Sequence, residues 1–195
     1  MRLLQKLMRR LAPLLAVFAV ALPLPAAAQP AALQEGNQYI RLKNPQPVET
    51  GKKIEVLEFF SYGCPHCGDL EPVLQGWLKT MPADVQFRRI PVMFQDRWTP
   101  LAKIFYTLEA LGEEARLSPE VFTALHGKGL SLWQEKTFFD WAAGQGLDRK
   151  KVEDMYNSFG IGGKVNRARL AAQAYQVLAR RWGEVSAFGA FLDPV

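Results

Sequence analysis

Residues 54–67 read IEVLEFFSYGCPHC, and this stretch decides the fold. The apolar run Ile54–Phe60 is typical of a buried strand, and Ser61–Gly63 is typical of a turn. Beyond them, helical spacing is shown by the apolar residues Leu70, Val73, Leu74, Trp77 and Leu78. Pro72 inside this run is expected to kink the helix without ending it. The sequence therefore predicts a strand, a turn and a helix that begins at Cys64-Pro65-His66-Cys67.

This motif holds the only two cysteines in 195 residues. A C-x-x-C pair that makes up the whole cysteine content is typical of a reactive dithiol rather than of a disulfide framework. A thiolate at a helix start is stabilised by unpaired backbone N–H groups and by the helix dipole, which lowers its pKa. We therefore predict that Cys64 is the attacking sulfur and that Cys67, on the same helix face, is the resolving one. A stabilised thiolate favours the reduced form and makes the disulfide a strong oxidant.

The two residues between the cysteines have supporting roles in this prediction. His66 could add a hydrogen-bond donor or a positive charge beside Cys64. Pro65 suits the first helical turn, because it has no N–H group to leave unsatisfied there. Both are therefore counted among the candidate site residues.

Three other uses of the motif are less favoured. A structural disulfide would close so short a loop that it removes little entropy from the unfolded chain. A zinc site needs about four ligands, and the chain offers only Cys64, Cys67, His66 and His126, with His66 poorly placed between the thiols. Covalent haem attachment needs C-x-x-C-H, and residue 68 is glycine. We expect neither a metal nor a bound cofactor.

Residues 1–28 have the pattern of a secretory signal peptide. A basic start with Arg2, Lys6, Arg9 and Arg10 precedes the apolar stretch Leu11–Leu24 and the cleavage pattern Ala26-Ala27-Ala28. The alternative is an uncleaved anchor, for which the apolar stretch is short. Cleavage removes four of the 24 basic side chains and none of the 19 acidic ones, leaving a net charge near +1. The sequence therefore favours export to an oxidising compartment and gives no case for nucleic-acid binding.

The rest of the chain predicts an α/β core interrupted by a helical subdomain. Two further strands are expected at residues 38–42 and 84–94. Helices are expected at residues 99–111, 118–127, 135–143, 148–159 and 164–176, with a break at the glycines of residues 160–163. Most aromatic residues of the helical block are expected in the core. Arg88-Arg89 and Arg149-Lys150-Lys151 are interpreted as solvated faces.

The segment Val56–Cys67 resembles the active-site segment of the DsbA-type periplasmic thiol–disulfide oxidoreductases, and the resemblance extends over residues 38–177. It implies a thioredoxin-like fold with an inserted helical subdomain. The expected division is a signal peptide at residues 1–28, the first part of the thioredoxin-like core at 29–96, the helical insertion at 97–165, and a return to the core at 166–195.

The resemblance also implies roles and partners. Cys64 would form the mixed disulfide with a reduced substrate protein, and Cys67 would resolve it. Glu58 matches a buried acidic residue that assists proton transfer in the family; the alternative is an exposed strand glutamate. The implied partners are newly exported substrate proteins and a DsbB-type membrane quinone reductase that reoxidises a monomeric protein.

The tail after Val177 departs from the family. The family places a cis-proline opposite the C-x-x-C motif, in a Val-Pro or similar pair that opens the next strand. In residues 178–195 of this sequence the only proline is Pro194, one residue from the end. Our hypothesis is that a frameshift or another divergence alters the chain from Leu178 onward. The alternative is that residues 184–191 form the same strand without a cis-proline.

These patterns lead to one main interpretation of function. We predict an exported dithiol oxidase that introduces disulfide bonds into translocated proteins. One alternative is an isomerase or reductase of the same fold, distinguished by its redox potential. The other is a peptide-binding module without turnover.

Overall fold

The computed structural model describes residues 33–177. They fall into two compact units that divide between Arg41 and Leu42, and each is considered by itself. In residues 33–41 the chain turns at Gly36, which has a φ of 87°, and makes an isolated bridge between Glu35 and Tyr39. The prediction of a strand at residues 38–42 is therefore wrong. Its backbone groups are satisfied within the turn, where Gly36 N–H donates to the Tyr39 carbonyl at 2.8 Å.

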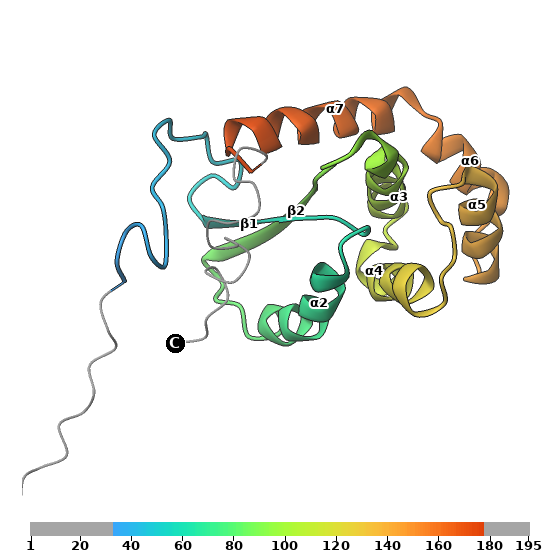
Figure 1. Cartoon of the computed structure of the whole chain (residues 1–195), viewed down its shortest axis with the longest axis horizontal. Helices are drawn as coiled ribbons and strands as arrows, with labels where there is room; N and C mark the ends of the chain where they lie inside the picture. Colours follow the sequence, from blue (N-terminus) through green and yellow to red (C-terminus); the bar gives the residue numbers. More distant parts are fainter. Residues whose placement is uncertain (1–32, 178–195) are drawn as a thin grey trace, which may run out of the picture. The chain divides into compact units, whose positions relative to one another are not determined.

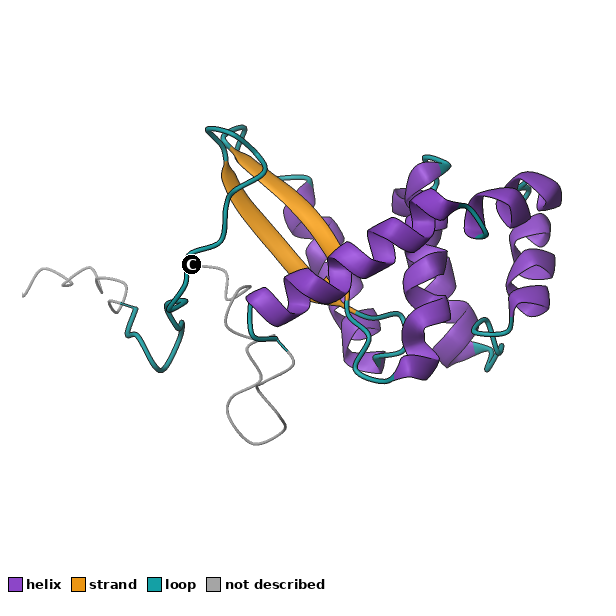
Figure 2. Ribbon diagram, turned by 90° about the horizontal axis from the view of Figure 1, so that it is seen from above, coloured by secondary structure: helices purple, strands orange, loops and turns teal. Residues whose placement is uncertain are grey.

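A parallel two-stranded sheet forms the centre of the larger unit. Strand β1 (Ile54–Phe60) pairs with β2 (Val85–Pro91) in a register that sets Ile54 beside Val85 and Glu58 beside Arg89. Helix α2 (Pro65–Leu78) makes the crossover between them and continues through Pro72, as predicted. Figures 1 and 2 show α2 on one side of the sheet and the last helix, α7, on the other. The strand–turn–helix predicted around the motif is confirmed.

The remaining chain is helical, as predicted. After a short 3-10 turn (Asp96–Trp98) come α3 (Thr99–Ala110), α4 (Glu114–Phe122), a π-helical turn (Thr123–Gly127), α5 (Glu135–Gly144), α6 (Arg149–Tyr156) and α7 (Phe159–Ala174). Asp148 caps α6 as predicted, its side chain accepting from the Lys151 N–H at 3.0 Å.

Three of the predicted helix limits are wrong. Helix α4 begins at Glu114 rather than at Ser118, because Glu114 in its first turn pairs with Arg89 at 2.9 Å. Helix α6 ends at Tyr156 instead of residue 159. Helix α7 runs through the glycines that were expected to break it, because Ser158 caps its first turn and Ile161 buries its side chain. These gains act against the roughly 1 kcal/mol that each interior glycine costs.

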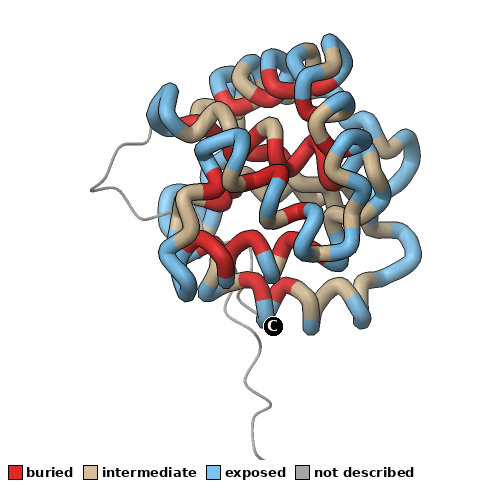
Figure 3. The backbone as a smooth tube through the Cα atoms, turned by 90° about the vertical axis from the view of Figure 1, so that its right-hand side faces the viewer, coloured by how far each residue is buried: buried red, intermediate tan, exposed pale blue. Residues whose placement is uncertain are grey.

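The core joins the sheet to the helical block. Its largest fully buried aromatic side chains are Phe60, Tyr62, Phe105, Phe138 and Tyr156. Figure 3 colours the positions of buried residues red along the backbone. The prediction that most aromatic residues of the helices are core is confirmed, although Trp133 remains 49% exposed.

Two predictions fall outside the described residues, namely the signal peptide at residues 1–28 and the altered tail from Leu178. Among residues 33–177, every helix is too short or too polar to cross a membrane.

Candidate active site

The two cysteines lie where β1 leads into α2. Cys64 is the N-cap of α2, with extended backbone angles, and Pro65 is the first helical residue. The Cys64 N–H donates to the Ser61 carbonyl at 3.0 Å, which closes a turn, and the Cys67 N–H donates to the Cys64 carbonyl at 3.1 Å. Local geometry thus holds the first sulfur at the open end of the helix, where its N–H groups have no helical partner.

The two thiols, which are both reduced, have different environments. Cys64 is half-buried, whereas Cys67 is only 5% exposed. A hydrogen bond from the Cys67 thiol, the backbone N–H groups of Cys67 and His66, and the charge of His66 together lower the pKa of Cys64 from 9.0 to about 6, against the opposing effect of burial. The same thiol hydrogen bond, followed by burial, raises the pKa of Cys67. The pair therefore keeps its negative charge on Cys64 and its proton on Cys67.

His66 projects into solvent. Its side chain is 93% exposed, and its Nδ1 lies 3.6 Å from the Asp69 carboxylate. The charge of His66 favours the Cys64 thiolate, but it acts less strongly than the thiol and backbone hydrogen bonds. His66 is therefore a secondary contributor to the electrostatics of Cys64.

Glu58 lies beneath the motif, inside the protein. Its side chain is 11% exposed and accepts a hydrogen bond from Nε of Arg89 at 2.8 Å. Burial raises its pKa, opposed by Arg89 and reinforced by the charges of Glu71 and Glu114. The charge of Glu58 in turn raises the pKa of Cys67. The expectation of a buried acidic side chain below the dithiol agrees with this geometry, and the alternative of an exposed strand glutamate does not.

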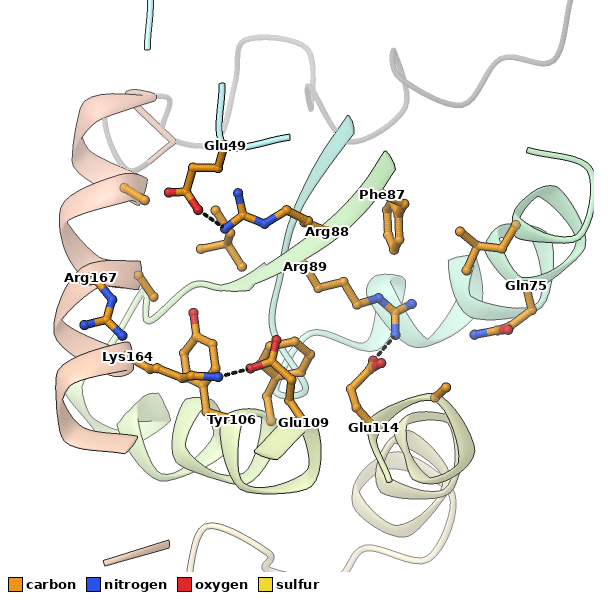
Figure 4. A pocket seen from close by; sticks show the side chains of 16 residues that line it. Glu49, Gln75, Phe87, Arg88, Arg89, Tyr106, Glu109, Glu114, Lys164 and Arg167 are labelled. Atoms are coloured by element: carbon orange, nitrogen blue, oxygen red, sulfur yellow. Dashed lines mark hydrogen bonds and ion pairs between the residues drawn. The ribbon is translucent and has the colours of Figure 1, made fainter. Parts of the chain in front are cut away.

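Arg89 is a site residue that the sequence analysis missed. Its side chain is 5% exposed, so its interpretation as part of a solvated face is wrong. It pairs with three carboxylates, those of Glu58, Glu71 and Glu114, at 2.8, 2.6 and 2.9 Å; Figure 4 shows the bond to Glu114. The sequence did contain one signal for its burial. Arg89 lies two residues after Phe87 in β2, so both side chains are on the same, inward face of the strand.

An apolar surface borders the turn before Cys64. Trp98 packs so closely on Gly63 that a Cβ atom there would lie 2.9 Å from Trp98 Cε2. The ring of Phe94, which is 44% exposed, meets Trp98 edge to face at 5.8 Å. Aromatic surface of this kind suits the apolar side chains of an unfolded polypeptide.

The chain is similar to known thiol–disulfide exchange proteins. No family model matches it. It is 42% identical over 144 residues to the thiol:disulfide interchange protein DsbA of Bordetella parapertussis, covering 74% of this chain and 68% of that protein. It is 41% identical over 164 residues to DsbA of Pseudomonas aeruginosa PAO1, and the match covers 84% of this chain and 78% of that protein.

Solved structures agree with these relatives. The crystal structure of Pseudomonas aeruginosa DsbA matches with a TM-score of 0.69 and 41% identity, covering 72% of this chain and 73% of that one. The crystal structure of the oxidoreductase DsbA from Xylella fastidiosa matches with a TM-score of 0.69 and 27% identity. The match covers 73% of this chain and 78% of that one.

Fold and site together define a protein disulfide oxidoreductase with a thioredoxin-like fold and a helical insertion. This class is the one predicted from the sequence. More narrowly, the chain belongs to the DsbA family, whose members introduce disulfide bonds by exchange with the thiols of substrate proteins.

Proposed function

We propose that this oxidoreductase is exported to the periplasm and oxidises newly translocated proteins, with Cys64 as the sulfur that forms the mixed disulfide. The observation that carries the proposal is the difference between the two thiols: Cys64 is half-buried with a pKa of about 6, and Cys67 is buried with a raised pKa. An incoming sulfur can therefore reach only Cys64, and the charge of the reduced pair rests there.

The reaction proceeds in two exchanges. A substrate thiolate attacks Sγ of Cys64 in the oxidised protein, the Cys64–Cys67 bond breaks, and Cys67 leaves and takes up a proton. The second substrate thiolate then attacks the substrate sulfur of the mixed disulfide, and Cys64 leaves as a stabilised thiolate. Two electrons pass from two substrate thiols to the Cys64–Cys67 pair, and the substrate gains one disulfide bond. The low pKa of Cys64 makes it the better leaving group and drives the second exchange.

Glu58 supplies the proton that Cys67 needs in the first exchange. A carboxyl group whose pKa is raised by burial holds a proton closer to neutral pH than an exposed one does. The positive charge of Arg89 stabilises the ionised Glu58 carboxylate after the proton has left. Glu58→Gln should therefore slow the first exchange, with little change in the second.

Family membership supports the following proposal for the partners. Substrates are unfolded or newly exported proteins with free thiols, and a DsbB-type membrane quinone reductase takes the two electrons from the reduced pair. Export depends on residues 1–28, and the mature chain acts as a monomer.

The experiment is an equilibrium of the mature full-length chain with glutathione, followed by oxidation of a reduced protein substrate. A strong preference for the reduced form, together with rapid substrate oxidation that is lost in Cys64→Ala, would support the proposal. An equilibrium that favours the disulfide would instead indicate a reductase of the same fold. Peptide binding without turnover in the wild-type protein would indicate a binding module.

A further inference from the structure

One face of the helical block contacts the turn that leads to the dithiol. Ser118 and Phe122 on α4 and His126 on the following π turn succeed one another at intervals of four residues. In an α-helix, residues four apart drift by about 40° around the axis. A π turn takes more residues per turn and so brings His126 back toward the face of Phe122.

All three side chains contact a single residue of the turn, Tyr62, which is 1% exposed. The Tyr62 hydroxyl lies 2.6 Å from Oγ of Ser118, and its ring meets Phe122 edge to face at 5.1 Å. The Tyr62 carbonyl lies 2.7 Å from Nε2 of His126. A carbonyl can only accept, so Nε2 of His126 carries the hydrogen and donates it.

The bond from His126 acts on the central peptide of the turn. That turn spans Ser61–Cys64, closed by the hydrogen bond from Cys64 N–H to the Ser61 carbonyl, and its central peptide joins Tyr62 to Gly63. The carbonyl of this peptide accepts from His126, and its N–H donates to Oγ of Ser61 at 3.2 Å. Both polar groups of the central peptide are therefore hydrogen-bonded to side chains, those of His126 and Ser61.

This peptide has two orientations open to it. Type I and type II turns differ by a flip of the central peptide, and type II requires a positive φ at the third position, where glycine is favoured. Residue 63 is a glycine and does not have a positive φ here, so the type II form is sterically open but not adopted. In the observed orientation both polar groups of the central peptide are paired, the N–H with Ser61 Oγ and the carbonyl with His126, and these two hydrogen bonds favour it over the flipped form.

We propose that His126 is a positioning residue for disulfide exchange, because its hydrogen bond to the Tyr62 carbonyl selects the turn that places Cys64 at the N-cap of α2. In the flipped turn the carbonyl would point away from His126 and the N–H of the same peptide would point away from Ser61 Oγ, so the turn that leads into Cys64 would lose both hydrogen bonds that hold it. The inference rests on the proposed function, in which Cys64 is the sulfur that forms the mixed disulfide. The role of His126 is indirect, because His126 contacts the turn rather than the reacting sulfurs.

The test compares two variants of similar size in the mature full-length chain. His126→Gln keeps a side-chain donor, and His126→Met fills the space without one. Lys128→Ala, at an exposed residue just after the same π turn, is the control. The readouts are the pKa of Cys64, from thiolate absorbance against pH, and the equilibrium with glutathione.

We expect His126→Met to raise the pKa of Cys64 and to shift the equilibrium toward the disulfide by about three- to tenfold, since one pKa unit corresponds to a tenfold change. His126→Gln and Lys128→Ala should stay close to the wild-type protein. Equal behaviour of the Met and Gln variants would overturn the role of His126 while leaving that of Cys64 intact. A wild-type Cys64 that titrates near 9.0 would overturn both.

Discussion

Glu58 and Arg89 lie side by side on the paired strands β1 and β2, and Nε of Arg89 donates to the Glu58 carboxylate at 2.8 Å. Arg89 also pairs with Glu71 and Glu114, so one guanidinium pairs with three carboxylates from β1, α2 and α4. The parallel register thus connects the strand that leads to Cys64 with both α2 and the helical block.

The first prediction concerns the reactivity of the two thiols. In the reduced mature protein, Cys64 should be alkylated with a pH midpoint of about 6, because only its thiolate reacts. Cys67 should react far more slowly, because it is buried and holds its proton. Mass spectrometry of peptides after timed alkylation at several pH values measures both rates. Equal rates would contradict the asymmetry of the site.

The second prediction concerns stability and redox state. The folded pKa of Cys64 is depressed, so its contribution to the reduced protein is complete above 9.0, partial between 9.0 and about 6, and lost below that. The oxidised protein has no thiol to titrate, and a disulfide across so short a loop adds little. We expect the reduced form to have the larger free energy of unfolding near neutral pH, with an advantage that shrinks on acidification.

Denaturant unfolding of both forms at about pH 5, 7 and 9 provides the measurement. A difference that stayed constant with pH, or one that grew as the pH fell, would argue against thiolate stabilisation by the fold.

The third prediction concerns Arg89. Arg89→Met should lower the free energy of unfolding at neutral pH by about 3–5 kcal/mol, because it leaves buried carboxylates without their partner. Without the arginine, the folded pKa of Glu58 rises further above its unfolded value, and this favours the folded state at low pH and penalises it at high pH. The deficit should therefore shrink on acidification. Arg88→Met, at a more exposed position on the same strand, should cost less, because it removes the partner of one buried carboxylate, that of Glu55, rather than of the three around Arg89.

The fourth prediction uses two glycines of α2. A Cβ atom at Gly68 would lie 3.2 Å from Cδ1 of Phe122, whereas at Gly76 it would meet nothing within 4 Å. Gly76→Ala should therefore raise the free energy of unfolding by about 0.5–1 kcal/mol through helix propensity alone. Gly68→Ala should gain less or lose stability, because Phe122 must shift. Thermal unfolding of both variants measures the two changes in stability. Equal gains in the free energy of unfolding would show that the Phe122 ring can move aside at no cost.

The fifth prediction concerns the residues after Val177, which lie outside the described part of the chain. If a frameshift altered them, another reading frame of the coding DNA downstream of Val177 should encode a Val-Pro pair, an alternating strand and a final helix. If neither frame does so, the tail is a genuine variation, and substrate oxidation by the mature chain measures its effect.

Much of the site could be predicted because its determinants are local. The strand before Cys64, the helix start at Pro65 and the cap at Asp148 each depend on residues within one or two turns. Arg89 could not be placed in the same way, because its burial depends on the register between strands whose paired residues are 31 apart. The start of α7 was misjudged because helix propensity at Gly160 was weighed without the burial of Ile161.

The contacts to Tyr62 have a consequence for the order in which the protein matures. Ser118 and His126 lie 56 and 64 residues beyond Tyr62 in the chain. Synthesis proceeds from the N-terminus, so the two cysteines emerge well before the residues that fix the turn beside them. A nascent chain that has reached only α2 has the two cysteines but lacks both hydrogen-bond partners of Tyr62. If His126 positions the turn as proposed, the fully active dithiol forms only after α4 and the π turn have folded against Tyr62, and disulfide exchange then depends on completion of this part of the helical block.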